Sequence, residues 1–111
     1  MDKLEKYRQY IQELLTEIGN YKNHFPEIET QIVFDTTHDH YQLVNVGWRG
    51  MEMTYGVSIH IDIKDGKIWI QQNNTDLLIA EDLVEKGVPK SDIVLAFHAP
   101  YKRKYTEYAA A

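Results

Sequence analysis

The sequence predicts a small α+β fold made of an N-terminal helix, a four-stranded antiparallel meander, a second helix and a fifth strand. Three observations predict it. Apolar residues recur every third or fourth position before residue 20, as in an amphipathic helix. Between residues 28 and 71 they largely alternate with polar residues and are interrupted by short turns, as in antiparallel strands. With 111 residues and no linker or repeat, the chain is predicted to form one domain over residues 1–111.

The N-terminal helix is predicted because one stripe of its surface is apolar and the opposite stripe is polar or charged. The apolar stripe consists of Leu4, Tyr7, Ile11, Leu14, Leu15 and Ile18. Gly19 is expected to end the helix in a left-handed cap, and Asn20 and Asn23 suit the turn that follows. A stripe of this width needs one packing surface, so we expect the helix to cover a sheet.

The four meander strands are predicted over residues 28–35, 41–48, 53–63 and 68–71. The Asp65-Gly66 pair between the last two is a strong signal for a tight hairpin. One face of the sheet, expected to meet the helices, carries Ile59, Ile61, Ile63, Ile68 and Ile70. The opposite face is expected to carry Thr54, Gly56, Ser58, His60, Asp62 and Trp69. A mixed polar and aromatic face of this kind is expected to meet a partner or a terminal segment.

A second helix and a fifth strand are predicted after the meander. Thr75 suits an N-cap, and Gly87 is expected to end the helix. The buried stripe of this helix is expected to contain Leu78, Ile79, Leu83 and Val84. Residues 93–97 form a continuous apolar run of strand length, which predicts a buried strand. The residues after 98 show no clear period.

Composition excludes several classes of site. The absence of cysteine excludes disulfides, Cys-ligated zinc, iron–sulfur clusters and a thiol nucleophile. The sequence contains no nucleophile motif and no glycine-rich phosphate loop, so we predict no catalytic residue and no cofactor. A charged N-terminus and the lack of a long apolar run predict a cytoplasmic protein with no membrane segment.

The charge distribution disfavours binding to a phosphate backbone by a broad face. The formal net charge is −5, and residues 28–100 hold five basic and eleven acidic side chains. An acidic body repels DNA and RNA, so nucleic-acid binding by the body of the protein is not expected.

The pair His60 and Asp62 is the main candidate for a functional site. On a strand, residues two apart share a face, so an imidazole and a carboxylate are expected to lie side by side. Such a pair can orient a base, hold a metal or contact a partner. We predict partner contact, with Trp69, Gln71 and His98 as further members and with no metal site. His98 would approach His60 if the fifth strand lies beside the third.

A second histidine cluster, residues 38–40, is predicted to lie in a solvated hairpin loop. Two histidines and a carboxylate can bind nickel or zinc, but a structural zinc site needs four ligands. The sequence offers no further ligand at a fixed spacing.

The basic run Lys102, Arg103 and Lys104, with Tyr105 beside it, is a candidate contact for nucleic acid or for a partner. Three cations lose much of their affinity for DNA at physiological salt. A C-terminal segment docked on the sheet through its tyrosines is the favoured alternative.

Several short motifs, taken in order, resemble one family. They are Phe34-Asp35-Thr36, Tyr41-Gln42-Leu43, Val46-Gly47-Trp48, His60-Ile61-Asp62-Ile63, residues 66–72 and 87–95, Phe97-His98-Ala99-Pro100 and residues 103–106. Their order and spacing resemble the XisI family, the excision controlling factor of the fdxN element, which is typical of cyanobacteria. Two departures are Val57, where many relatives have cysteine, and Glu107-Tyr108, where Gly-Phe is more usual.

The resemblance implies a non-enzymatic protein that works with a XisH-like partner of nuclease-like fold and with a recombinase–DNA complex in DNA excision. Three other functions stay open: a DNA-binding control factor that uses the basic tail, an antitoxin-like inhibitor of the XisH-type partner, and a metal-dependent hydrolase built on His60, Asp62 and His98. Sheet edges and exposed aromatic residues also predict a homodimer.

Overall fold

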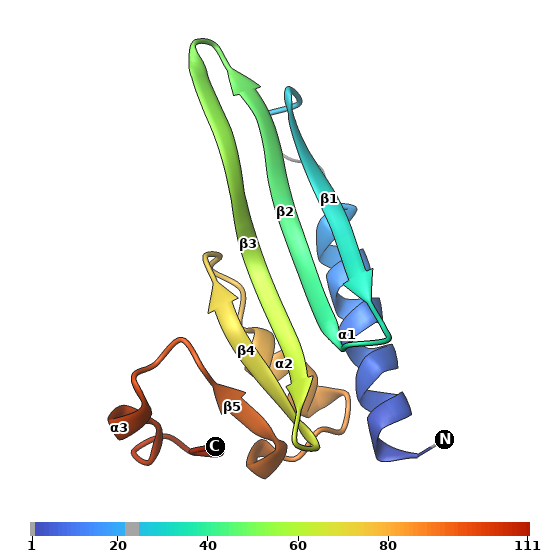
Figure 1. Ribbon diagram of the computed structural model, residues 1–111, viewed down its shortest axis with the longest axis vertical. Helices are drawn as coiled ribbons and strands as arrows, with labels where there is room; N and C mark the ends of the chain where they lie inside the picture. The colour runs from blue at the N-terminus through green and yellow to red at the C-terminus, as the bar shows by residue number, and fades with distance from the viewer. Residues whose placement is uncertain (1, 22–24) are drawn as a thin grey trace.

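The computed structural model describes residues 2–21 and 25–111. Its elements, in chain order, are α1 (Lys3–Gly19), β1 (Ile28–Asp35), β2 (His40–Arg49), β3 (Glu52–Lys64), β4 (Lys67–Asn73), α2 (Ile79–Glu85), the short 3-10 helix η1 (Lys90–Asp92), β5 (Ile93–Leu95) and α3 (Pro100–Arg103). Figure 1 shows α1 and α2 behind one sheet, whose other face points toward the viewer. The predicted α+β class is confirmed.

The sheet is mixed rather than purely antiparallel. Its strand order is β1-β2-β3-β4-β5, and the first four strands pair in antiparallel fashion, as the predicted meander requires. The fifth strand extends the same sheet and runs parallel to β4. Helix α2 joins β4 to β5, because a parallel pair needs a crossover connection. The complete sheet therefore has five strands.

The core lies between the sheet and the two helices. The predicted stripe of α1 is confirmed, since Tyr7, Ile11, Leu14 and Leu15 are buried. The sheet contributes Tyr41, Leu43, Ile59, Ile61, Ile63, Ile68, Ile70 and Ile93, and the segment around α2 contributes Ile79, Leu83 and Val88. The expected helix-facing isoleucines of β3 and β4 are all in this cluster. Burial of this set is the main driving force for folding.

The end of α1 differs from the prediction. Gly19 is the last residue of the helix and does not have a positive φ; Asn20 caps the helix in a right-handed conformation. A Cβ at Gly19 would lie 2.7 Å from Ile32 Cγ1, so glycine permits close packing of α1 on β1. Asn23, predicted to lie in the following turn, is outside the described residues.

A β-bulge in β3 changes which residues share a face. Leu43 pairs with Ile59, but Val44 pairs with Val57, so Ser58 is an extra residue on β3. One extra residue inverts the alternation along the rest of the strand. The expectation that Thr54 and Gly56 lie on the face of His60 and Asp62 is therefore wrong. That face carries instead Val57, Tyr55 and Met53.

The second helix begins later than predicted. It starts at Ile79 after Leu78, and no side chain caps its first turn. Thr75 does not act as the N-cap, because its Oγ1 accepts from the Leu77 backbone N–H and bonds to the Asn73 side chain within the preceding turn. The predicted stop is confirmed, since the helix ends at Glu85 and Gly87 adopts φ +115°.

The C-terminal segment docks against the edge of the sheet. After α3, Ala109 forms a bridge to Val94, and its N–H donates to the Ile93 carbonyl at 2.8 Å. Tyr108 packs against the core, as the predicted docked tail requires, but Tyr101 and Tyr105 are 68% and 79% exposed, so only one of the three tyrosines docks. Within the described part of the chain, none of the helices has the length and apolarity needed to cross a membrane.

Candidate functional site

The open face of the sheet, opposite α1 and α2, carries a polar cluster formed by His40, Gln42, His60, Asp62 and Gln71. His40 begins β2 and pairs directly with Asp62 on β3, and Gln42 pairs with His60. Directly paired residues in an antiparallel ladder point to the same side. The register of one strand pair therefore brings these four side chains together.

Asp62 is the centre of this polar cluster. Its Oδ1 lies 2.8 Å from His40 Nδ1 and 2.8 Å from His60 Nε2. Its Oδ2 accepts from Gln71 Nε2 at 3.2 Å. Gln42 Nε2 lies 3.3 Å from His60 Nδ1. The carboxylate is therefore held by three side chains, and the predicted contact between His60 and Asp62 is confirmed.

The protonation of the cluster follows from these contacts. Burial alone would raise the pKa of Asp62, but the hydrogen bonds from His40 and His60 outweigh it and lower that pKa. The hydrogen bond to Asp62 also raises the pKa of the His40 imidazole. If the Gln42 amide donates to His60 Nδ1, the proton of the neutral His60 ring lies on Nε2, from which it is donated to Asp62. Asp62 therefore stays ionised near neutral pH.

The predicted loop cluster at residues 38–40 is divided between two sites. His38 remains in the turn, where its Nδ1 contacts Asp35 Oδ2 at 2.9 Å. Asp39 accepts two hydrogen bonds from Arg8 on α1 and one from Tyr41. His40 belongs to β2 and reaches Asp62, so the assignment of all three residues to a solvated loop is wrong.

His98 does not join the cluster. Strand β4 lies between β3 and β5, so the fifth strand is not beside the third. The ring centre of His98 lies 4.6 Å from the ring centre of Phe97, at the turn after β5. The conditional prediction of a His60, Asp62 and His98 group is wrong.

An apolar patch continues the open face toward the tip of the β2–β3 hairpin. It consists of Val44, Val46, Trp48, Met53, Tyr55 and Val57, in three directly paired rows. Tyr55 is 74% exposed, Met53 is 62% exposed and Trp48 is 58% exposed. We call this set the hairpin patch. The patch was not predicted from the sequence, because nothing marks Ser58 itself as an extra residue. The signal that could have found it is Gly56, since an isolated glycine inside a strand pattern indicates a nearby bulge.

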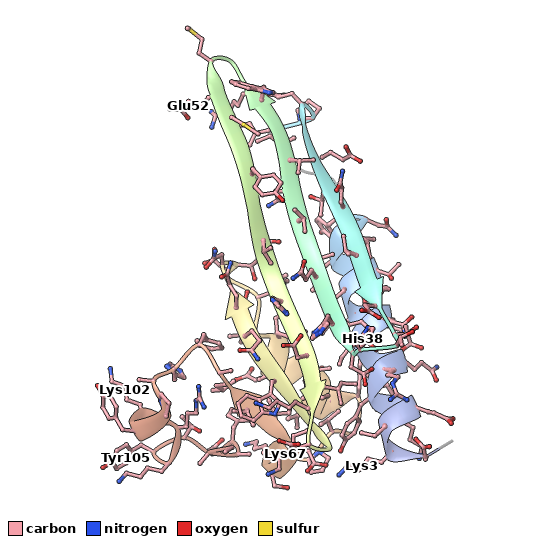
Figure 2. All side chains as sticks on the ribbon, viewed as in Figure 1. Lys3, His38, Glu52, Lys67, Lys102 and Tyr105 are labelled. Atoms are coloured by element: carbon pink, nitrogen blue, oxygen red, sulfur yellow. The ribbon has the colours of Figure 1, made fainter. Side chains whose placement is uncertain are left out.

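The basic tail lies at the opposite end of the molecule. Figure 2 shows Glu52 at the hairpin tip and Lys102 and Tyr105 far below it. Lys102, Lys104 and Tyr105 are exposed. The three predicted cations therefore lie apart from the hairpin patch.

Arg103, in contrast, has a structural role within the C-terminal segment. Its guanidinium donates to the carbonyls of His98 at 3.0 Å and Ala96 at 3.1 Å. It also lies 5.6 Å from the ring centre of Trp69, whose other neighbour is Lys64 at 4.8 Å. Trp69 thus contacts two cations, and the predicted basic run offers two lysines rather than three cations to a ligand.

Comparison with known proteins identifies the family. The family model described as XisI protein matches residues 1–110. A solved structure of a XisI-like protein from Anabaena variabilis ATCC 29413 is 50% identical, with a TM-score of 0.93, covering 97% of this chain and 99% of that one.

A second solved structure from the same organism is described as fdxN element excision controlling factor XisI. It is 35% identical, with a TM-score of 0.88, covering 99% of this chain and 100% of that one. No protein with a curated functional description matches the chain. On the matched family model and these two structures, the chain belongs to the XisI family.

Proposed function

We propose that this protein is a non-catalytic controlling factor in the excision of a DNA element, and that it acts by binding a XisH-like protein through the hairpin patch. The role in excision control follows the description of the 35% identical relative. The observation that carries the binding mode is the hairpin patch. It is built on the hydrogen-bonded pair of strands β2 and β3 and is not covered by α1 or α2 (Figure 1).

The residue types of the patch favour a protein partner. Tryptophan, tyrosine and methionine are enriched in the cores of protein interfaces, where charged residues are depleted. Trp48 and Met53 form one cross-strand pair, and Val46 and Tyr55 form the next. These pairs give a partner a continuous apolar surface, with Glu52 beside it at the hairpin tip. Single exposed apolar residues are common, but a paired array of them indicates an interaction surface.

The charge of the chain supports a model in which the partner, and not this protein, contacts the DNA. A protein that cleaves or holds DNA needs cationic surface, whereas this chain has a net charge of −5. An acidic subunit is electrostatically suited to a basic partner and gains association rate from that attraction. Direct DNA binding by the tail is less well supported, since Arg103 is engaged with backbone carbonyls.

The test is binding between purified protein and the XisH-like protein from the same genome. Trp48→Ala and Tyr55→Ala should each weaken binding by about 2 kcal/mol or more, which is roughly 30-fold in Kd. Tyr21→Ala is the matched control, because Tyr21 is 84% exposed but follows α1. Both test residues are exposed, so the variants should fold.

Three results would contradict the proposal. Absence of binding at micromolar concentrations would show that the partner is wrong. Equal loss in Tyr21→Ala would place the interface elsewhere. If Trp48→Ala dissociates a homodimer but leaves binding of the XisH-like protein unchanged, the patch serves self-association instead. A nuclease or recombination assay with the intact complex then shows whether the protein activates its partner or inhibits it, as an antitoxin would.

A further inference from the structure

We propose that His40, His60 and Asp62 form a binding site for one divalent transition-metal cation of the zinc, nickel and copper class. The three ligand atoms lie within 4.8 Å of one another. This inference is independent of partner binding through the hairpin patch, because it rests on the polar cluster alone.

The geometry brings two imidazole nitrogens to one carboxylate oxygen. His40 Nδ1 and His60 Nε2 each lie 2.8 Å from Asp62 Oδ1. Around a tetrahedral zinc ion with bonds of about 2.0–2.1 Å, neighbouring ligand atoms lie about 3.3 Å apart. A cation would therefore need the two nitrogen–oxygen pairs to separate by about half an ångström. The two nitrogens, which lie within 4.8 Å of each other, would also have to settle at about 3.3 Å. The His40 side chain is 55% exposed, so it has room to make this adjustment.

The ligand set selects the class of cation. Two neutral imidazoles and one carboxylate suit zinc, nickel and copper, whereas magnesium and calcium prefer oxygen ligands throughout. Each imidazole would bind the cation through the nitrogen that now faces Asp62, with the proton of a neutral ring moving to its other nitrogen. Three protein ligands leave one position of a tetrahedral ion to water. The cluster is partly exposed, so that position is open to solvent.

Outer contacts are already in place to orient two of the ligands. Gln71 holds Asp62 Oδ2, which leaves Oδ1 for the cation. Gln42 faces His60 Nδ1, and its amide would rotate to offer Oε1 to the new N–H at that nitrogen. Hydrogen bonds of this kind to metal ligands fix the orientation of the ligands, and their removal typically weakens metal affinity about 10–100-fold. The structure thus supplies candidate ligands and support for them, whereas we predicted no metal site from the sequence.

Zinc chloride titrated into tag-free, chelator-treated protein, followed by calorimetry, tests the site. The wild type should bind one zinc per chain, and saturating zinc should raise its unfolding temperature. His40→Gln and His60→Gln should each lose more than about tenfold in affinity. His38→Gln is the matched control, since His38 also contacts a carboxylate, that of Asp35, but lies outside the cluster.

The cobalt-loaded protein gives a readout that does not depend on stability. Its visible absorption should show tetrahedral coordination in the wild type and should be lost in His40→Gln. His40 is the exposed ligand, so this variant keeps the fold and the outcome stays interpretable. The site is disproved if the wild type fails to bind zinc at about 100 µM, a concentration at which a Kd of micromolar order would saturate it. It is equally disproved if His38→Gln loses as much affinity as His40→Gln.

Discussion

The guanidinium of Arg8 on α1 clasps the carboxylate of Asp39 in the β1–β2 turn, with Nε 2.8 Å from Oδ1 and Nη2 3.2 Å from Oδ2. Tyr41, which is fully buried, donates a third hydrogen bond to Asp39 at 2.8 Å. The contact joins the helix to the end of the sheet that also positions His40. A change at Asp39 should therefore affect both stability and the polar cluster.

The Arg8 contact predicts a specific loss of stability in acid. The hydrogen bonds from Arg8 lower the pKa of Asp39 in the folded protein. An aspartate with a lowered folded pKa stabilises the fold above its unfolded pKa of about 3.9 and loses this contribution as the pH falls through the folded value. Denaturant unfolding should show Asp39→Asn less stable than wild type at pH 7, with the difference shrinking below about pH 4. Arg8→Gln should remove the same stabilising contact, so the double variant should lose less free energy of unfolding than the sum of the two single losses. Full additivity of the losses would contradict the coupling.

Substitution of Gly47 should destabilise the fold, although Gly47 lies in the partly exposed β2–β3 hairpin. It has φ +150°, and a Cβ would clash with the Glu27 carbonyl oxygen and lie 3.0 Å from Ile28 Cα. Gly47→Ala should cost about 1–3 kcal/mol in the free energy of unfolding, because the obstacle is backbone. Gly56→Ala is the control: its Cβ would have no neighbour within 4 Å among the described residues, and it should be neutral or stabilising. Equal effects in the two variants would refute the argument.

Tyr7 should contribute through its hydroxyl as well as its ring. The ring is buried in the core, and the hydroxyl donates to Asp92, which Lys3 also contacts at 3.1 Å. Tyr7→Phe keeps the packing and removes a hydrogen bond to a carboxylate, so it should cost about 1.5 kcal/mol by denaturant unfolding. Tyr21→Phe, at an exposed tyrosine, should cost nothing measurable.

Arg103 should hold the C-terminal segment rather than bind DNA. Arg103→Ala removes two hydrogen bonds to carbonyls and the contact with Trp69. Exchange of the Ala109 amide hydrogen, which bonds to Ile93, should accelerate at least about tenfold as the segment opens more often. Lys104→Ala should leave that exchange unchanged. Low-salt DNA binding that disappears in Lys102→Ala and Lys104→Ala would favour the DNA-binding alternative instead.

The elements that the sequence predicted well are those whose signals are local. The alternation through Ile59, Ile61 and Ile63 and the Asp65-Gly66 turn specify the last hairpin without reference to the rest of the chain. The position of β5 beside β4 was not predictable in this way. It depends on how far the α2 crossover carries the chain, and residues 93–97 read as a buried strand in either position.

Only part of the candidate site was predicted, because only part of it depends on local sequence. His60 and Asp62 are two residues apart, so strand geometry alone places them together. His40 is 22 residues from Asp62 and reaches it through the register of β2 on β3. The bulge at Ser58 arises from that register too, and its effect on Tyr55 and Met53 follows only once the pairing is known.

The bridge between Val94 and Ala109 covers part of the outer edge of β5. A bare outer strand is a template on which other chains can add strand after strand, the route to fibres. On the β5 side Ala109 pairs with Val94, so the addition of strands there would first require the C-terminal segment to detach. The outer strand at the other end of the sheet is β1, where Val33 is exposed. Insoluble assembly should therefore begin at β1, and shortening the chain before Ala109 would give it a second starting point.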